Sequence, residues 1–209
     1  MVHLKLLPLS LLFFLTLAPR AEQEIVFPDA VKYVNPAASI EKAKAVCLTA
    51  EEKRLVDIIN AYRRTKGLHA LAATKSLSYV AKVHAGDLAN NNPVTASCNM
   101  HSWSNAGPWS PCCYTRDHAK AKCMWKKPSE LSQYPGSGFE ISSGSSGGRI
   151  DAATALRVWQ GSSGHNSVIV NEGMWNKPWR AFGVGIEKGY AVAWFGNEGD
   201  PMGTATVCK

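Results

Sequence analysis

Apolar residues recur at helical spacing in three segments of the chain, and each segment carries its own start or stop signal. The first helix is expected to begin at residues 49–52, a capping-box sequence with Thr49 as the cap, and to end at Gly67. A second is expected from about Ser76 to Asn90, before Pro93, and a third after Asp151 as its cap. The residues expected to form the apolar faces of these helices are Leu55, Ile58, Ile59, Tyr62, Leu77, Val80, Ala81, His84, Leu88, Ala155, Leu156, Val158 and Trp159.

Alternation with a period of two appears near the carboxyl end of the chain. Apolar residues at 182, 184 and 186 alternate with Gly183 and Gly185, a turn is expected at 187–189, and the return strand alternates at 190, 192 and 194. The two glycines leave one face bare, which suits close approach by another backbone. A short strand is also expected at 139–141. Helices followed by a terminal hairpin predict an α+β layered fold.

The chain is expected to hold one domain behind an amino-terminal leader. Residues 1–21 have the pattern of a secretory signal peptide, because their apolar run at 6–18 is shorter than the about 20 residues that a bilayer requires. An uncleaved membrane anchor is the alternative, and no later segment is apolar enough to span a membrane. Residues 22–46 show no strong hydrophobic periodicity and are expected to lie over the surface of the domain, which occupies 47–209.

Composition and charge narrow the function classes. The 209 residues are 45% hydrophobic and 19% charged, as in an ordinary packed domain. The formal net charge is +7, and removal of residues 1–21, which carry Lys5 and Arg20 and no acid, lowers it to about +5. The basic residues are scattered and are not interleaved with aromatic residues, so nucleic-acid binding is not expected. Attraction to anionic cell surfaces stays open.

Six cysteines in an extracytoplasmic context predict disulfide bonds. They allow 15 pairings, and the sequence does not choose among them. Two adjacent cysteines are expected to take different partners, and the first and last bracket the domain and could join its ends. Zinc binding by cysteine is not favoured, because no C-x-x-C spacing occurs. Most of the cysteines lie in an irregular segment, 98–137, which we expect them to staple; the six are Cys47, Cys98, Cys112, Cys113, Cys123 and Cys208.

Three segments combine polar residues that could do chemistry with neighbouring apolar residues: 99–103, 138–141 and 159–166.

Residues 142–148 are a serine- and glycine-rich stretch, interpreted as a flexible link, and 144–148 formally match the G-x-S-x-G nucleophile motif of serine hydrolases. The match has little weight, because a low-complexity stretch produces it easily and few strands precede it. The chain is also small for an α/β-hydrolase.

The order of several segments resembles a known family. Residues 159–165 place a tryptophan at a helix end, a Ser/Gly turn and a histidine, and a Gly-Val-Gly strand follows at 182–186. The helix and following residues at 60–71, the segment 84–87 and the strand at 190–196 are similar to the same family. This family is the CAP superfamily of cysteine-rich secretory, antigen 5 and pathogenesis-related proteins. The resemblance covers 48–197 and is closest to the short bacterial branch.

The resemblance implies a three-layer α-β-α sandwich around a central, mostly antiparallel sheet. It also implies a cleft with two histidines and usually two acids. By position, His101 and His165 match the histidines and Glu140 matches the first acid. No acid lies between Trp159 and His165 to match the second, as in shorter bacterial members. Residues 102–137 form a cysteine-rich insertion that is expected to cover or narrow the cleft.

These side chains suit particular chemistry. Two neutral imidazoles and a carboxylate can hold Zn²⁺ or a similar divalent cation, or serve as acid and base. The leading hypothesis is a secreted, extracellular binding scaffold whose His101, Glu140 and His165 cleft takes a divalent cation, a small apolar ligand such as a lipid or sterol, or both. One alternative is a metal-assisted peptidase with Glu140 as the base. The other is an interaction protein whose insertion binds an extracellular or cell-surface partner. His84 is interpreted as a histidine at the edge of the core.

Overall fold

The computed structural model describes residues 36–144 and 148–209. A three-stranded antiparallel sheet lies at the centre, in the order β2–β4–β3. β4 (Tyr190–Gly196) pairs along its whole length with β2 (Gly138–Gly144) and β3 (Ala181–Glu187). β3 and β4 form the predicted hairpin, and Lys188 in its turn has a φ of 50°. A short parallel pair, β1 (Cys47–Leu48) with β5 (Thr206–Val207), lies apart from this sheet.

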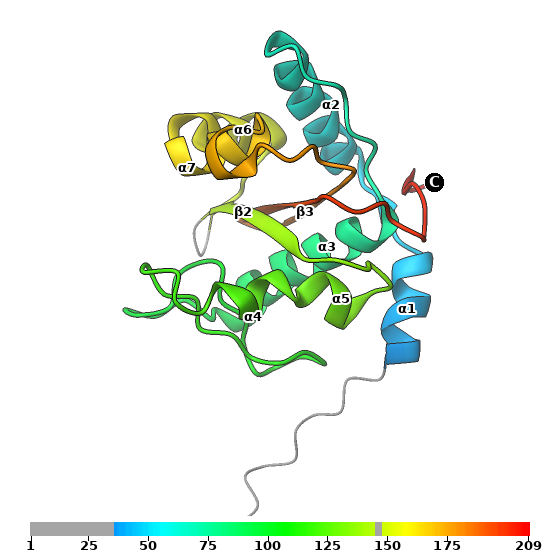
Figure 1. Ribbon diagram of the computed structural model, residues 1–209. Helices are drawn as coiled ribbons and strands as arrows, with labels where there is room; N and C mark the ends of the chain where they lie inside the picture. The colour runs from blue at the N-terminus through cyan, green and yellow to red at the C-terminus, as the bar shows by residue number, and fades with distance from the viewer. Residues whose placement is uncertain (1–35, 145–147) are drawn as a thin grey trace, which may run out of the picture. The chain divides into compact units, whose positions relative to one another are not determined.

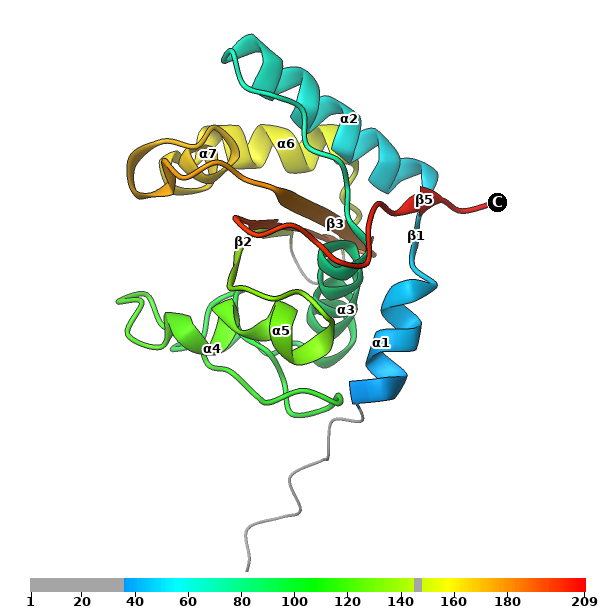
Figure 2. The same ribbon diagram turned by 45° about the vertical axis from the view of Figure 1, so that its right-hand side comes forward.

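Helices cover both faces of the sheet (Figures 1 and 2). One layer contains α2, α6 and α7, and the other contains α1, α3, α4 and α5; the short 3-10 helix η1 follows α7. Their bounds are Pro36–Lys44 for α1, Ala50–Thr65 for α2, Lys75–Asn91 for α3, Ala121–Trp125 for α4, Lys127–Leu131 for α5, Ala152–Gly161 for α6, Ser163–Ile169 for α7 and Gly173–Trp175 for η1.

The alternation along β4 produces two separate cores. Ala191, Ala193 and Phe195 pack with the layer of α2, α6 and α7. Tyr190, Val192 and Trp194 pack with the layer of α3, α4 and α5. The expected three-layer α-β-α arrangement is therefore present, with the antiparallel sheet as the middle layer.

The bare face of β3 allows α3 to lie directly against the sheet. A Cβ at Gly183 would stand 2.1 Å from the backbone nitrogen of Ser78, and one at Gly185 would stand 2.4 Å from that of Lys82. No side chain fits in this space, so the alternating glycines are a condition of the helix–sheet contact, as the sequence predicted.

The predicted helix signals are present. The Thr49 side chain accepts from the backbone N–H of Glu52 while Glu52 accepts from that of Thr49, which completes the capping box of α2. α3 ends before Asn92, which adopts a left-handed conformation, and Asp151 caps α6 by accepting from Thr154. The first two of these helices begin and end within about two residues of the expected positions, and α6 begins directly after its expected cap.

All six cysteines form disulfides, which confirms the expectation of bridges. No cysteine is left free to bind zinc, which excludes the alternative that the sequence did not favour. Cys47–Cys208 joins the two ends of the domain. Cys98–Cys113 and Cys112–Cys123 staple the insertion, and the adjacent cysteines take different partners, as expected.

Three parts of the chain differ from the expectation. Residues 36–44, within the expected leader, form α1, which packs on α3 and α5 and buries Ala43. The sequence has no apolar stripe there that would predict this helix. The insertion contains α4 and α5, so it is only partly irregular. Residues 142–144, expected to be a flexible link, are the end of β2, because pairing with β4 overrides their composition.

Several predictions concern residues that the structure does not describe. The expected signal peptide, residues 22–35 of the leader and most of the G-x-S-x-G match lie outside the described residues. Within the described ranges, no helix has the length and apolarity needed to cross a membrane.

Candidate functional site

The carboxylate of Glu140 is the centre of the candidate site. Glu140 lies on β2 opposite Trp194, and its side chain is fully buried. One carboxylate oxygen accepts from Nδ1 of His84 on α3, and the other accepts from Nδ1 of His101 at 2.7 Å. Three segments that are distant in the sequence therefore meet at one carboxylate.

His84 connects this carboxylate to the loop that carries His101. Its Nε2 lies 3.0 Å from the carbonyl oxygen of Ser102, and its ring stacks on Trp103 with a centroid distance of 4.3 Å. Both nitrogens thus face groups that only accept hydrogen bonds, so both must carry protons for the two bonds to form. We therefore describe His84 and Glu140 as a buried imidazolium–carboxylate pair, with an aromatic face beside the cation.

The environment of Glu140 keeps its carboxylate charged. Burial alone would raise its pKa, but the charge of His84 and the hydrogen bonds from His101 and His84 outweigh it and lower the pKa of Glu140 below the ordinary value. With both oxygens occupied by imidazoles, the carboxylate orients its neighbours instead of facing an open site.

The loop that presents His101 is held at several points. The Asn99 side chain accepts from the backbone N–H of His101, and backbone hydrogen bonds pair Trp103 with Cys112 in both directions. Ser102 accepts from the backbone of Tyr114 through its hydroxyl. Because Nδ1 of His101 donates to Glu140, its Nε2 is left unprotonated in the neutral ring.

His165 approaches from the opposite helical layer. It lies in the first turn of α7, where the hydroxyl of Ser162 accepts from its backbone N–H, and its ring centroid is 6.2 Å from that of His101. The neighbouring Asn166 accepts from the Tyr62 hydroxyl at 2.8 Å, which ties α7 to α2. Burial, followed by the nearby His101, lowers the pKa of His165 to about 4, so its imidazole is neutral at pH 7.

His101, Glu140 and His165 all line one cavity of about 520 Å³. The imidazoles of His101 and His165 form one part of its lining, and the rest is mostly apolar. Five of the lining residues come from the 102–137 insertion, which narrows the cavity; they are Tyr114, His118, Ala121, Met124 and Trp125.

Aromatic contacts hold the apolar wall together. The Phe139 ring lies 5.5 Å from Trp125 and 4.9 Å from Trp175, between the insertion and the loop after α7. Asn171 supports that loop by donating to the carbonyl oxygen of Trp175, and the buried Arg63 donates to Asn171. The neighbouring Met174 is 74% exposed at the rim of the cavity.

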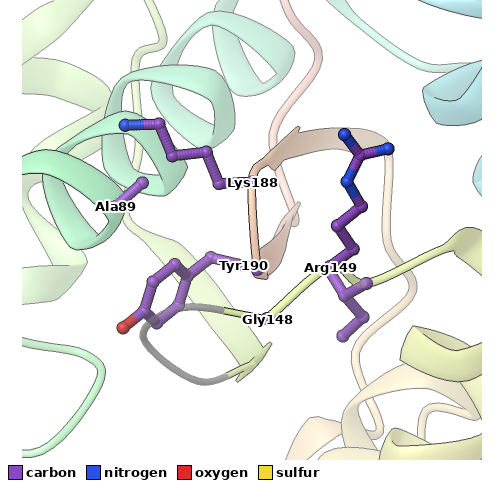
Figure 3. A pocket seen from close by; sticks show the side chains of 7 residues that line it. Ala89, Gly148, Arg149, Lys188 and Tyr190 are labelled. Carbon is purple, nitrogen blue, oxygen red and sulfur yellow. The ribbon is translucent and has the colours of Figure 1, made fainter.

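Two further hollows lie near the other end of β2. One, of about 380 Å³, shares Ser162 and His165 with the first cavity. The other is larger, about 590 Å³, and is lined by residues that include Arg149, Lys188 and Tyr190 (Figure 3). It contains none of the three predicted site residues, and the Lys188 amine donates a hydrogen bond to Asn90. We therefore do not place the candidate functional site in this hollow.

The sequence pointed to three of the residues at this site and missed others. His84 is buried, as a core histidine would be, but its bond to Glu140 was not expected, because its helical position does not reveal a partner 56 residues away. The apolar wall was also missed. Nothing in the sequence pairs Trp125 with Phe139 and Trp175.

Comparison with known proteins agrees with this architecture. The model of the CAP family, described as the cysteine-rich secretory protein family, matches residues 56–191. No curated protein matches the chain.

Solved structures that are similar to this chain include three whose alignments each cover 71% of it. An extracellular SCP-domain protein from Bacillus anthracis is 18% identical, with a TM-score of 0.47. A cysteine-rich secretory protein from Staphylococcus aureus is 16% identical, with a TM-score of 0.45. An outer surface protein from Borrelia burgdorferi is 17% identical, with a TM-score of 0.48, over 92% of its length. The match spans only 40% and 38% of the first two proteins.

Replacement of Glu140 by glutamine should destabilise the protein by about 3–5 kcal/mol, because it leaves the buried His84 cation without its counter-charge. Urea unfolding at pH 7 measures this loss. The matched control is Glu187→Gln, since Glu187 is exposed and has no ion pair in the described structure, and it should change stability by less than about 0.5 kcal/mol. A Glu140→Gln loss as small as that of the control would show that the pair is not charged.

The stability of the protein should fall between pH 6.5 and about 4 partly because of His165. The unfolded chain takes up a proton near pH 6.5, whereas the folded state resists it until about pH 4. Wild type should therefore lose more free energy of unfolding over this interval than His165→Gln, in guanidinium titrations at several pH values. The exposed His69, changed to glutamine, is the control. Parallel pH profiles for wild type and His165→Gln would contradict the burial of a neutral imidazole.

Proposed function

Because this chain belongs to the CAP, or cysteine-rich secretory protein, family, we propose that it is a secreted binding module whose cleft takes a small ligand with an apolar body and a polar end. The observation that carries the proposal is the composition of the 520 Å³ cavity. Its lining is mostly apolar and aromatic, and its polar side chains include the imidazoles of His101 and His165. Ligand sites commonly combine a largely apolar lining with a few fixed polar groups.

The apolar wall favours a lipid- or sterol-like body over a sugar or a nucleotide. Met124, Val168 and Trp175 offer apolar surface, and no Lys or Arg lines the cavity among the described residues. The exposed Met174 at the rim adds a flexible apolar contact where a ligand would enter. A strongly anionic group would find no cation within this cavity.

The proposal is tested by replacing Trp175 with alanine and measuring binding of the neutral probe Nile red by fluorescence. The affinity should fall about tenfold, the loss expected when an aromatic wall residue is truncated. Val207→Ala is the control, because Val207 is an exposed apolar residue on β5 outside the cavity. Equal affinities for wild type and Trp175→Ala, or no binding by wild type, would contradict the proposal.

Binding of a divalent cation is a second candidate function. It is supported by Nδ1 of His165, which is buried without a hydrogen-bond partner, and by the carboxylate behind His101, an arrangement typical of metal-binding histidines. In this arrangement His101 and His165 would hold the ion, which would polarise a ligand oxygen, and Glu140 would orient His101. The described residues contain no cluster of three or more His, Cys, Asp or Glu side chains placed to bind a metal, so we propose a two-histidine site.

Calorimetric titration of EDTA-treated protein with ZnCl₂ at pH 7 tests this candidate. Wild type should bind one ion, and His101→Ala or His165→Ala should weaken binding at least tenfold, since each removes one protein ligand. His69→Ala, outside the cavity, should leave binding unchanged. A folded wild-type protein that binds no zinc would contradict the proposed cation site.

The peptidase and interaction alternatives have less support. A general base must reach the proton that it removes, but both oxygens of Glu140 already accept from imidazoles and its side chain is fully buried. The insertion supplies part of the cavity wall, and no separate feature of it identifies a protein partner. Binding of an extracellular or cell-surface partner stays a prediction.

A further inference from the structure

Apart from its histidines, the titratable residues with a full charge that line the 520 Å³ cavity are acids. Glu140 and Glu172 line it, and no Lys or Arg does so among the described residues. The charge of Glu140 is balanced by its hydrogen-bonded partner His84, so Glu172 carries the uncompensated charge. Lys120 and Lys122, on the neighbouring insertion, do not line the cavity. The cavity therefore has an excess of negative charge, although the whole chain has a formal net charge of +7.

Glu172 is held in place through its backbone, and its side chain has no partner in the described structure. It lies between α7 and η1, where its backbone N–H donates to the carbonyl oxygen of Ser167 at 2.9 Å and its own carbonyl oxygen accepts from Trp175 at 3.1 Å. The residue is exposed, and its carboxylate forms no ion pair or hydrogen bond with the described residues. This carboxylate is therefore available to a cationic group of a ligand.

Aromatic side chains supply the second part of a site for a cation. Trp125, Phe139 and Trp175 line the cavity, and the Phe139 ring is inclined by 67° to Trp125 and by 58° to Trp175. Stacked rings cover one another's faces, whereas rings inclined in this way leave face area to a ligand. The face of an aromatic ring attracts an organic cation. Because Trp175 lies in the short helix that Glu172 begins, one turn presents both a carboxylate and an indole.

These groups suit an organic ammonium ion better than an inorganic cation. Ca²⁺ and Mg²⁺ require about six or more oxygen ligands, and the described residues contain no cluster of three or more side chains placed to bind a metal. An organic ammonium ion needs one counter-charge, and its carbon groups pack on aromatic surface. The lining supplies both.

We infer that the cavity binds a compact organic ammonium ion, whose charge lies between the Glu172 carboxylate and the Trp175 ring and whose apolar body packs on Phe139 and Trp125. The volume of about 520 Å³ is in the range of sites for small molecules. The inference rests on the proposed function, because the cavity must first accept the apolar body. It adds the sign of the charge at the polar end and the residues that recognise it.

The test compares ligands that differ only at the polar end. 4-Phenylbutylamine, which is an ammonium ion at pH 7.5, 4-phenylbutan-1-ol and 4-phenylbutanoate compete with Nile red for the protein, with EDTA present so that no divalent cation occupies the histidines. Wild type should bind the ammonium ion about tenfold more tightly than the alcohol, the combined effect of a carboxylate and an aromatic face. The carboxylate ligand should bind most weakly, because the described lining offers it no lysine or arginine.

Variants at two positions identify the groups that recognise the charge. Glu172→Gln should reduce the preference for the ammonium ion over the alcohol by about threefold and leave the affinity for the alcohol unchanged, whereas Glu172→Asp, which keeps the charge, should retain most of the preference. Trp175→Leu keeps an apolar side chain without the ring and should also reduce the preference. Glu187→Gln is the matched control, because Glu187 is exposed and lies outside the cavity.

The outcomes separate the two proposals. If wild type binds the alcohol or the carboxylate ligand as tightly as the ammonium ion, or if Glu172→Gln or Trp175→Leu leaves the preference intact, this inference is overturned while the binding function stands. If wild type binds neither Nile red nor any of the three ligands, the proposed function fails and the inference fails with it.

Discussion

A buried carboxylate shared by two imidazoles is the constraint on which the rest of the site depends. A charge removed from water must be paired and hydrogen-bonded, and Glu140 meets this condition only if α3, β2 and the loop at 99–103 keep their relative positions. His84 donates to Glu140 on one side and to the Ser102 carbonyl on the other. The orientation of His101 toward the cavity follows from this arrangement.

The sheet and the disulfides maintain that arrangement. The glycines of β3 allow α3 to approach the sheet within the distance of backbone contact, and this approach brings His84 near Glu140 on the neighbouring layer. On the insertion side, Cys98–Cys113 and Cys112–Cys123 limit the movement of the segment that carries His101 and part of the cavity wall.

Much of the fold could be predicted from the sequence because its signals are local. The capping box before α2, the stop at Asn92 and the alternation of β3 and β4 each depend on neighbouring residues. α1 and the last residues of β2 could not be predicted in this way, because their conformation depends on packing and pairing with distant segments. The prediction that His101, Glu140 and His165 share a hollow came from a family resemblance and agrees with the lining of the cavity. The partnership of His84 with Glu140 and the aromatic wall depend on contacts between segments, so periodicity and composition do not reveal them.

The central claim is that His84 is a cation paired with Glu140, and that His101 donates to the same carboxylate from Nδ1. Long-range ¹H–¹⁵N spectra of the histidine side chains at pH 7, assigned with His84→Gln and His101→Gln variants, report the protonation of each nitrogen directly. The account predicts that both nitrogens of His84 are protonated and that Nδ1 of His101 is protonated. A neutral His84 with one protonated nitrogen would contradict it.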